Sequence, residues 1–102
     1  MGQPIVVVEK PTARPGVWRF ETNRVLTGMA HERYVKSREV IGTRPPDEIA
    51  RRLFTQGGAE EVHVYGNVVT VTLARGHGPE GIREIIEGLH TYYREGVTPA
   101  IP

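Results

Sequence analysis

The sequence predicts an α+β domain in which two helices cover one face of a mostly antiparallel sheet. Two runs of alternating apolar residues flank Gly66-Asn67, which is typical of a β-hairpin. Residues 46–56 and 79–95 each carry a single apolar stripe at helical spacing. Because such stripes and faces must be buried against one another, they predict a two-layer sandwich. The expected order is strand, strand, strand, helix, strand, strand, helix.

Three strands are expected before the first helix, at residues 3–9, 17–21 and 31–36. Two prolines and a glycine within residues 11–16 predict a turn, so the first two strands are expected to form a hairpin. Trp18 and Phe20 alternate onto the same face of the second strand and are expected in the core.

The first helix is expected to begin near Pro46, where a missing amide proton costs nothing, and to end at Gly57-Gly58. Asp47 and Glu48 in its first turn suit the positive end of the helix dipole. Its apolar stripe consists of Ile49, Leu53 and Phe54.

The hairpin over residues 60–75 is the clearest signal in the chain. A two-residue loop with glycine first suits a type II′ turn and pairs Val64 with Val69 and Val62 with Val71. One face of the pair is then apolar, with Val62, Val64, Val69, Val71 and Leu73. The other face carries Glu61, His63, Tyr65, Thr70 and Thr72. A slip of one residue would expose the apolar set, so the register is well specified.

The second helix is expected from about Pro79 to Glu95, after a loop at residues 75–79. Its stripe has the best helical period in the chain, with Ile82, Ile85, Ile86, Leu89 and Tyr93. A chain of 102 residues suits one domain. We expect residues 1–95 to form that domain and residues 96–102 to be a loose tail.

Composition excludes several classes of function. Thirteen basic and twelve acidic side chains leave a net charge of +1, which argues against a nucleic-acid or membrane surface. There is no cysteine, so disulfides, thiolate metal sites and a cysteine nucleophile are excluded. The longest apolar run, residues 5–8, is too short for a membrane span or a signal peptide. We therefore expect a cytoplasmic protein.

The residues capable of chemistry form no recognisable catalytic motif. Ser37 is the only serine and has no triad context. The four histidines, at positions 31, 63, 77 and 90, show no metal-ligand spacing, although a metal site built from distant segments stays open. We expect a non-enzymatic protein without a cofactor.

Two sets of residues are candidates for binding. His63, Tyr65 and Thr70 lie on the polar face of the hairpin, where an exposed aromatic residue is typical of a contact with a partner protein. Arg75 and His77, in a glycine-containing loop before a helix, are a candidate site for a phosphate or carboxylate. The glycines of that loop also suit a simple turn from strand to helix.

Several stretches resemble the N-terminal domain of the Nfu/NifU-type iron–sulfur scaffold proteins. Residues 9–12 and 17–20 are similar to that family's T-x-N-P-N-T-x-K-F stretch, with Ala13-Arg14-Pro15 in place of its Asn-Pro-Asn. Residues 46–54 resemble its S-P-L-A-x-x-L-F helix start. Residues 58–62 and 67–72 resemble its I-x-G-V-x-x-V and D-F-I-T-V-T segments.

The resemblance covers Ile5 to Tyr93 and implies an accessory role in iron–sulfur cluster assembly. In that family a separate C-terminal domain with a Cys-x-x-Cys pair ligates the cluster, and this chain has no cysteine. The leading hypothesis is therefore an interaction domain that docks on another protein, without nucleic acid or membrane, and the resemblance implies a partner from that machinery. The alternative is a small-anion or metabolite binder that uses Arg75 and His77.

Overall fold

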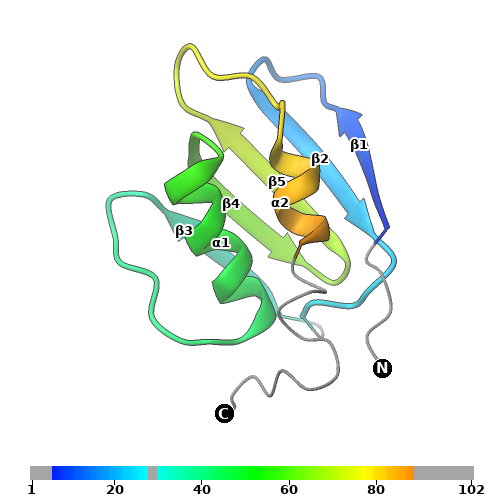
Figure 1. Ribbon diagram of the computed structural model, residues 1–102, viewed down its shortest axis with the longest axis vertical. Helices are drawn as coiled ribbons and strands as arrows, with labels where there is room; N and C mark the ends of the chain where they lie inside the picture. The colour runs from blue at the N-terminus through cyan, green and yellow to red at the C-terminus, as the bar shows by residue number, and fades with distance from the viewer. Residues whose placement is uncertain (1–5, 28–29, 89–102) are drawn as a thin grey trace.

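The structure, a computed structural model, describes residues 6–27 and 30–88 of the chain. Five strands form one antiparallel sheet in the order β1-β2-β5-β4-β3, and both helices lie on the same side of it (Figure 1). The elements are β1 (Val7–Pro11), β2 (Val17–Thr22), β3 (His31–Val35), α1 (Pro45–Gln56), β4 (Ala59–Tyr65), β5 (Val68–Leu73) and α2 (Ile82–Glu87). The predicted α+β fold and its order of elements are confirmed.

The hairpin of β4 and β5 has the register that the sequence predicts. Val62 lies opposite Val71, and Val64 lies opposite Val69. All four valines are fully buried, and Gly66 opens the turn with a φ of +61°, which glycine adopts without strain. The alternation of apolar and polar residues therefore fixes which side of the sheet faces the helices.

The connection between β2 and β3 crosses the end of this hairpin and binds its turn. The N–H groups of Leu26 and Thr27 donate to the Gly66 carbonyl at 2.8 and 3.2 Å, and the Gly66 N–H donates to Thr27 Oγ1 at 2.7 Å. On the other side, the Asn67 side chain donates to the Thr22 carbonyl at 2.8 Å. The connecting segment thus satisfies the polar groups of the turn while the chain passes to the far edge of the sheet.

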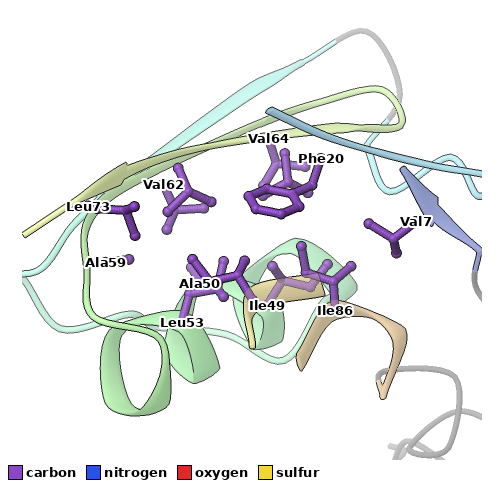
Figure 2. Close-up of a cluster of buried hydrophobic side chains, with 13 residues drawn as sticks. Val7, Phe20, Ile49, Ala50, Leu53, Ala59, Val62, Val64, Leu73 and Ile86 are labelled. Atoms are coloured by element: carbon purple, nitrogen blue, oxygen red, sulfur yellow. The ribbon is translucent and has the colours of Figure 1, made fainter. Parts of the chain in front are cut away.

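The core lies between the sheet and the two helices (Figure 2). Its largest fully buried side chains from the sheet and α1 are Phe20, Ile49 and Leu53. Ile82 and Ile86 complete it from α2. Trp18 and Phe54 are partly buried and pack against this cluster, as their positions in the pattern predict.

Two predicted boundaries are wrong. Pro11 belongs to β1, where it lies opposite Trp18, although the sequence placed it in the turn. β1 is an edge strand, and a residue without an N–H is tolerated at such a position. Residues 3–5 of the expected first strand lie outside the described residues.

The second helix begins at Ile82 and not at Pro79. Gly81 has a φ of +87°, and the Ile82 N–H donates to the Pro79 carbonyl, so residues 79–81 form a turn. Leu89, His90, Tyr93, the remainder of the expected helix and the expected tail lie outside the described residues.

We predict that Leu53→Ala and Ile86→Ala each lower the free energy of unfolding by about 2–5 kcal/mol, because each leaves a cavity in the core. The two side chains are 0% and 1% exposed. Urea denaturation of the variants measures the change. Ile41→Ala, at a side chain 84% exposed, is the control and should change stability by less than about 0.5 kcal/mol. Wild-type midpoints in both core variants would contradict this packing.

Candidate functional site

The candidate site is the face of the sheet opposite the helices, which we call the outer face. No described element packs across it, since both helices lie on the other side (Figure 1). The register places one residue from each strand in a row across this face: Lys10, Arg19, Thr70, His63 and Arg33. The row is mostly basic, and Thr70 and His63 occupy its centre.

The three predicted contact residues come together on the outer face. Thr70 lies opposite His63, and Tyr65 lies opposite Val68 in the neighbouring row. Tyr65 is 42% exposed, so its ring is available to a partner. The structure thus places His63, Tyr65 and Thr70 on one accessible surface.

His31 joins this group from β3, and the sequence did not single it out for this surface. Its ring stacks on Tyr65 with centroids 4.0 Å apart and an angle of 11° between the planes. Its Nδ1 lies 2.9 Å from Nε2 of His63. Only the pairing of β3 with β4 reveals this contact, because the two histidines are 32 residues apart in the chain.

The pKa of His63 is lowered from its usual value. Partial burial is the main cause, the positive charge of Arg33 and the neighbouring His31 add to it, and Glu61 opposes it. Desolvation and nearby cations both disfavour the imidazolium. The surroundings of His63 therefore favour its neutral form.

Two hollows lie on either side of the His63–Thr70 pair and share both residues. One of about 250 Å³ is lined by Arg14, Val17, Arg33, Glu61 and Thr72 as well. The other, of about 240 Å³, is lined by Arg19, Glu21, Tyr65 and Val68 as well. Each hollow contains an arginine and at least one threonine hydroxyl.

Some charged side chains of the outer face form ion pairs, and others do not. Glu21 pairs with Lys10 at 3.2 Å, and Glu61 pairs with Arg33 at 2.6 Å. Arg14 and Arg19 have no carboxylate partner among the residues that the structure describes. Both carboxylates in the hollows are thus occupied, while two guanidinium groups are free to bind an acidic ligand.

The second candidate, Arg75 with His77, lies in an exposed loop. The His77 ring packs so closely on Gly58 that a side chain at that position would collide with it. α2 begins five residues after His77, and its first N–H is already bonded to the Pro79 carbonyl. The first amide of α2 is therefore not available to an anion bound in this loop.

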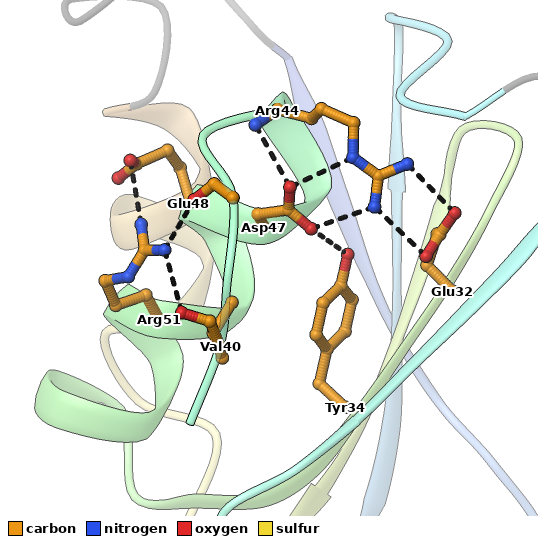
Figure 3. Close-up of polar contacts among 8 residues, drawn as sticks. Glu32, Tyr34, Val40, Arg44, Asp47, Glu48 and Arg51 are labelled. Carbon is orange, nitrogen blue, oxygen red and sulfur yellow. Dashed lines mark hydrogen bonds and ion pairs between the residues drawn. The ribbon is translucent and has the colours of Figure 1, made fainter. Parts of the chain in front are cut away.

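A third cluster surrounds Asp47, which lies in the first turn of α1 as the sequence predicts (Figure 3). Asp47 is only 1% exposed. Tyr34 Oη donates to its Oδ1 at 2.7 Å, and Arg44 donates to Oδ2 through its backbone N–H at 3.1 Å and Nε at 3.0 Å. Arg44 also binds Glu32 at 3.1 and 3.2 Å. The carboxylate therefore joins the start of α1 to β3.

Burial pushes the pKa of Asp47 upward, but hydrogen bonds from Arg44 and Tyr34 outweigh it, so the pKa lies below its usual value. The pKa of Tyr34 is raised, first by burial and then by its hydrogen bond to Asp47. Shifted groups of this kind also occur at catalytic sites. Here both carboxylate oxygens are bonded within the chain, and we interpret the cluster as structural.

Other kinds of site are not found in the described part of the chain. Residues 6–27 and 30–88 contain no group of three or more histidine, cysteine or acidic side chains that could hold a metal ion. Within the same ranges, no helix has the length and apolar character needed to cross a membrane.

Comparison with known proteins shows the fold of the chain but not its family. No protein-family model and no curated protein matches the sequence. Among solved structures, the crystal structure of protein SAV1430 from Staphylococcus aureus matches with a TM-score of 0.60 and 13% identity. The match covers 85% of this chain and 98% of that one. The chain is thus a small α+β protein with the fold of SAV1430.

We predict that Asp47→Asn lowers the free energy of unfolding at pH 7 by about 1.5–3 kcal/mol, as the loss of a charged hydrogen-bonded group does. Because the pKa of Asp47 is depressed in the folded state, its stabilisation is complete above the unfolded pKa of about 3.9. It is lost as pH falls through the folded pKa. The difference between wild type and variant should therefore shrink below about pH 4.

Urea denaturation at a series of pH values measures this difference. Glu9→Gln removes an exposed carboxylate on β1 and serves as the control, with little change expected at any pH. A difference for Asp47→Asn that stays constant down to pH 2 would show that the carboxylate charge does not stabilise the fold.

Proposed function

We propose that this protein is a non-enzymatic interaction domain whose outer face binds an acidic segment of a partner protein. The observation that carries the proposal is the charge pattern of the two hollows. Their glutamates are already paired, whereas Arg14 and Arg19 have no carboxylate partner among the described residues. Carboxylates from a partner would form ion pairs with these two arginines.

The geometry suits recognition of carboxylates. A guanidinium group binds a carboxylate through two parallel hydrogen bonds, which gives direction as well as affinity. Thr70 lines both hollows and Thr72 lines one, so hydroxyl donors accompany each arginine. One extended acidic segment lying across β2, β5 and β4 would reach both hollows.

Apolar contacts are available beside the charged ones. Tyr65 is 42% exposed and Val8 is 50% exposed, both at outward-facing positions of the sheet. Tyrosine and arginine are the residues that most often dominate binding energy at protein interfaces. The outer face combines both residue types on one rigid sheet.

We also propose that the partner belongs to iron–sulfur cluster assembly and that the protein acts in the cytoplasm. The support for this narrower proposal is the resemblance of residues 5–93 to the N-terminal domain of Nfu/NifU-type scaffolds. Without cysteine the chain would not hold a cluster through thiolates, so its role would be to dock on a protein that does. No cofactor is required.

We predict that a fluorescein-labelled, glutamate-rich peptide binds the wild-type protein at low salt. The double substitution Arg14→Glu with Arg19→Glu should weaken binding at least about tenfold, because each charge-assisted hydrogen bond contributes about 1.5–3 kcal/mol. Fluorescence anisotropy measures the affinity. Arg38→Glu with Arg75→Glu changes the net charge equally at exposed positions outside the two hollows and is the matched control.

Equal loss of affinity in the two double variants would mean that net charge, and not the outer face, determines binding. Tighter binding of a single-stranded DNA oligonucleotide in the same assay would contradict a protein partner. The narrower proposal is tested with a purified scaffold protein that carries a Cys-x-x-Cys domain. Absence of binding at low and high salt would remove it.

A further inference from the structure

The two histidines of the outer face meet edge to edge. Nδ1 of His31 and Nε2 of His63 are 2.9 Å apart, while the ring centroids are 5.0 Å apart and the planes differ by 12°. The two nitrogens thus lie between the rings and point toward each other. In the metal-free pair one nitrogen carries the proton and the other accepts it.

We propose that His31 Nδ1 and His63 Nε2 together bind one divalent transition-metal ion of the nickel, copper and zinc group. Neutral imidazole nitrogen is a preferred ligand of these ions. Metal–nitrogen bonds of about 2.0–2.1 Å separate two ligand nitrogens by about 2.9 Å at a right angle and about 3.4 Å at the tetrahedral angle. The observed 2.9 Å separation matches that of the right-angled arrangement that nickel and copper favour, while the two nitrogens face each other as a hydrogen-bonded pair.

Binding requires that the shared proton move to the outer nitrogen of the same ring and that the two rings tilt until their inner lone pairs converge on the ion. That nitrogen is Nε2 in His31 or Nδ1 in His63, so both inner lone pairs become free without a change of charge. Four groups surround the pair: Arg33 of β3, Glu61 and Tyr65 of β4, and Thr70 of β5. Arg33 and Glu61 form an ion pair at 2.6 Å, so Glu61 offsets part of the nearby positive charge.

Tyr65 acts as a positioning residue for this site. Its ring lies against the His31 ring, with centroids 4.0 Å apart, and limits the rotation of that imidazole. The residues that the structure describes offer no third histidine or carboxylate near enough to complete a larger cluster. Water or a side chain of a partner would fill the remaining positions, which makes the site exchangeable, unlike a structural zinc site with four protein ligands.

The test is isothermal titration calorimetry of the untagged full-length chain with nickel chloride and zinc chloride at pH 7.5. We expect one ion per chain. His31→Ala and His63→Ala should each weaken binding at least roughly tenfold, since even loss of an outer hydrogen-bonding partner typically costs that much. His77→Ala removes an exposed histidine elsewhere and should leave binding unchanged.

Three further measurements separate ligation from a general effect on the fold. The metal-free melting temperature of each variant should match wild type, and added nickel should raise it only where both histidines are present. Tyr65→Phe should keep wild-type affinity, whereas Tyr65→Ala should weaken it. Nitrogen-15 spectra of the side chains should show zinc-induced shifts at His31 Nδ1 and His63 Nε2.

The proposal would be overturned by wild-type affinity in either histidine variant, by equal loss in His77→Ala, or by no binding at millimolar ion. It does not depend on the acidic-peptide proposal, because His31 and His63 remain in the arginine variants. Metal binding and peptide binding are therefore separable outcomes.

Discussion

The structure depends most on the turn at Gly66-Asn67 and on the segment that binds it. The turn sets the register of β4 and β5, and that register decides which side chains are buried. Hydrogen bonds from Leu26 and Thr27 to the Gly66 carbonyl then join β2, the crossing segment and the hairpin. β2 pairs with β5, and β3 pairs with β4. The register of this hairpin therefore also determines which side chains of β2 and β3 face the helices.

A second consequence is that the two faces of the sheet carry different kinds of residue. The inner face consists of valines, Phe20 and Leu73, which pack on the helices and supply the hydrophobic free energy of folding. The outer face carries cations, threonines, two histidines and Tyr65, which the core does not require. Asp47 adds a polar link on the inner side of the sheet, because its hydrogen bonds to Tyr34 and Arg44 attach β3 to α1. We therefore expect substitutions of exposed residues on the outer face to leave the domain folded.

Much of this arrangement could be predicted from local pattern. Alternation gave the register of the hairpin and the buried set, and helical spacing gave Ile49, Leu53, Ile82 and Ile86. The burial of Asp47 could not be predicted, because a carboxylate in a first helical turn is usually solvated and only the position of Tyr34 on β3 buries it. The contact of His31 with His63 likewise depends on the pairing of distant strands, which no sequence spacing records.

We propose that the outer face is the binding surface of the domain, while the helical layer serves the core. An ¹H–¹⁵N NMR titration with the glutamate-rich peptide tests it most directly. We expect the backbone signals of His63, Tyr65, Thr70 and Arg19 to shift together along one saturable curve, while those of α1 and α2 stay in place. Shifts concentrated on the helices or at the loop of Arg75 and His77 would contradict it.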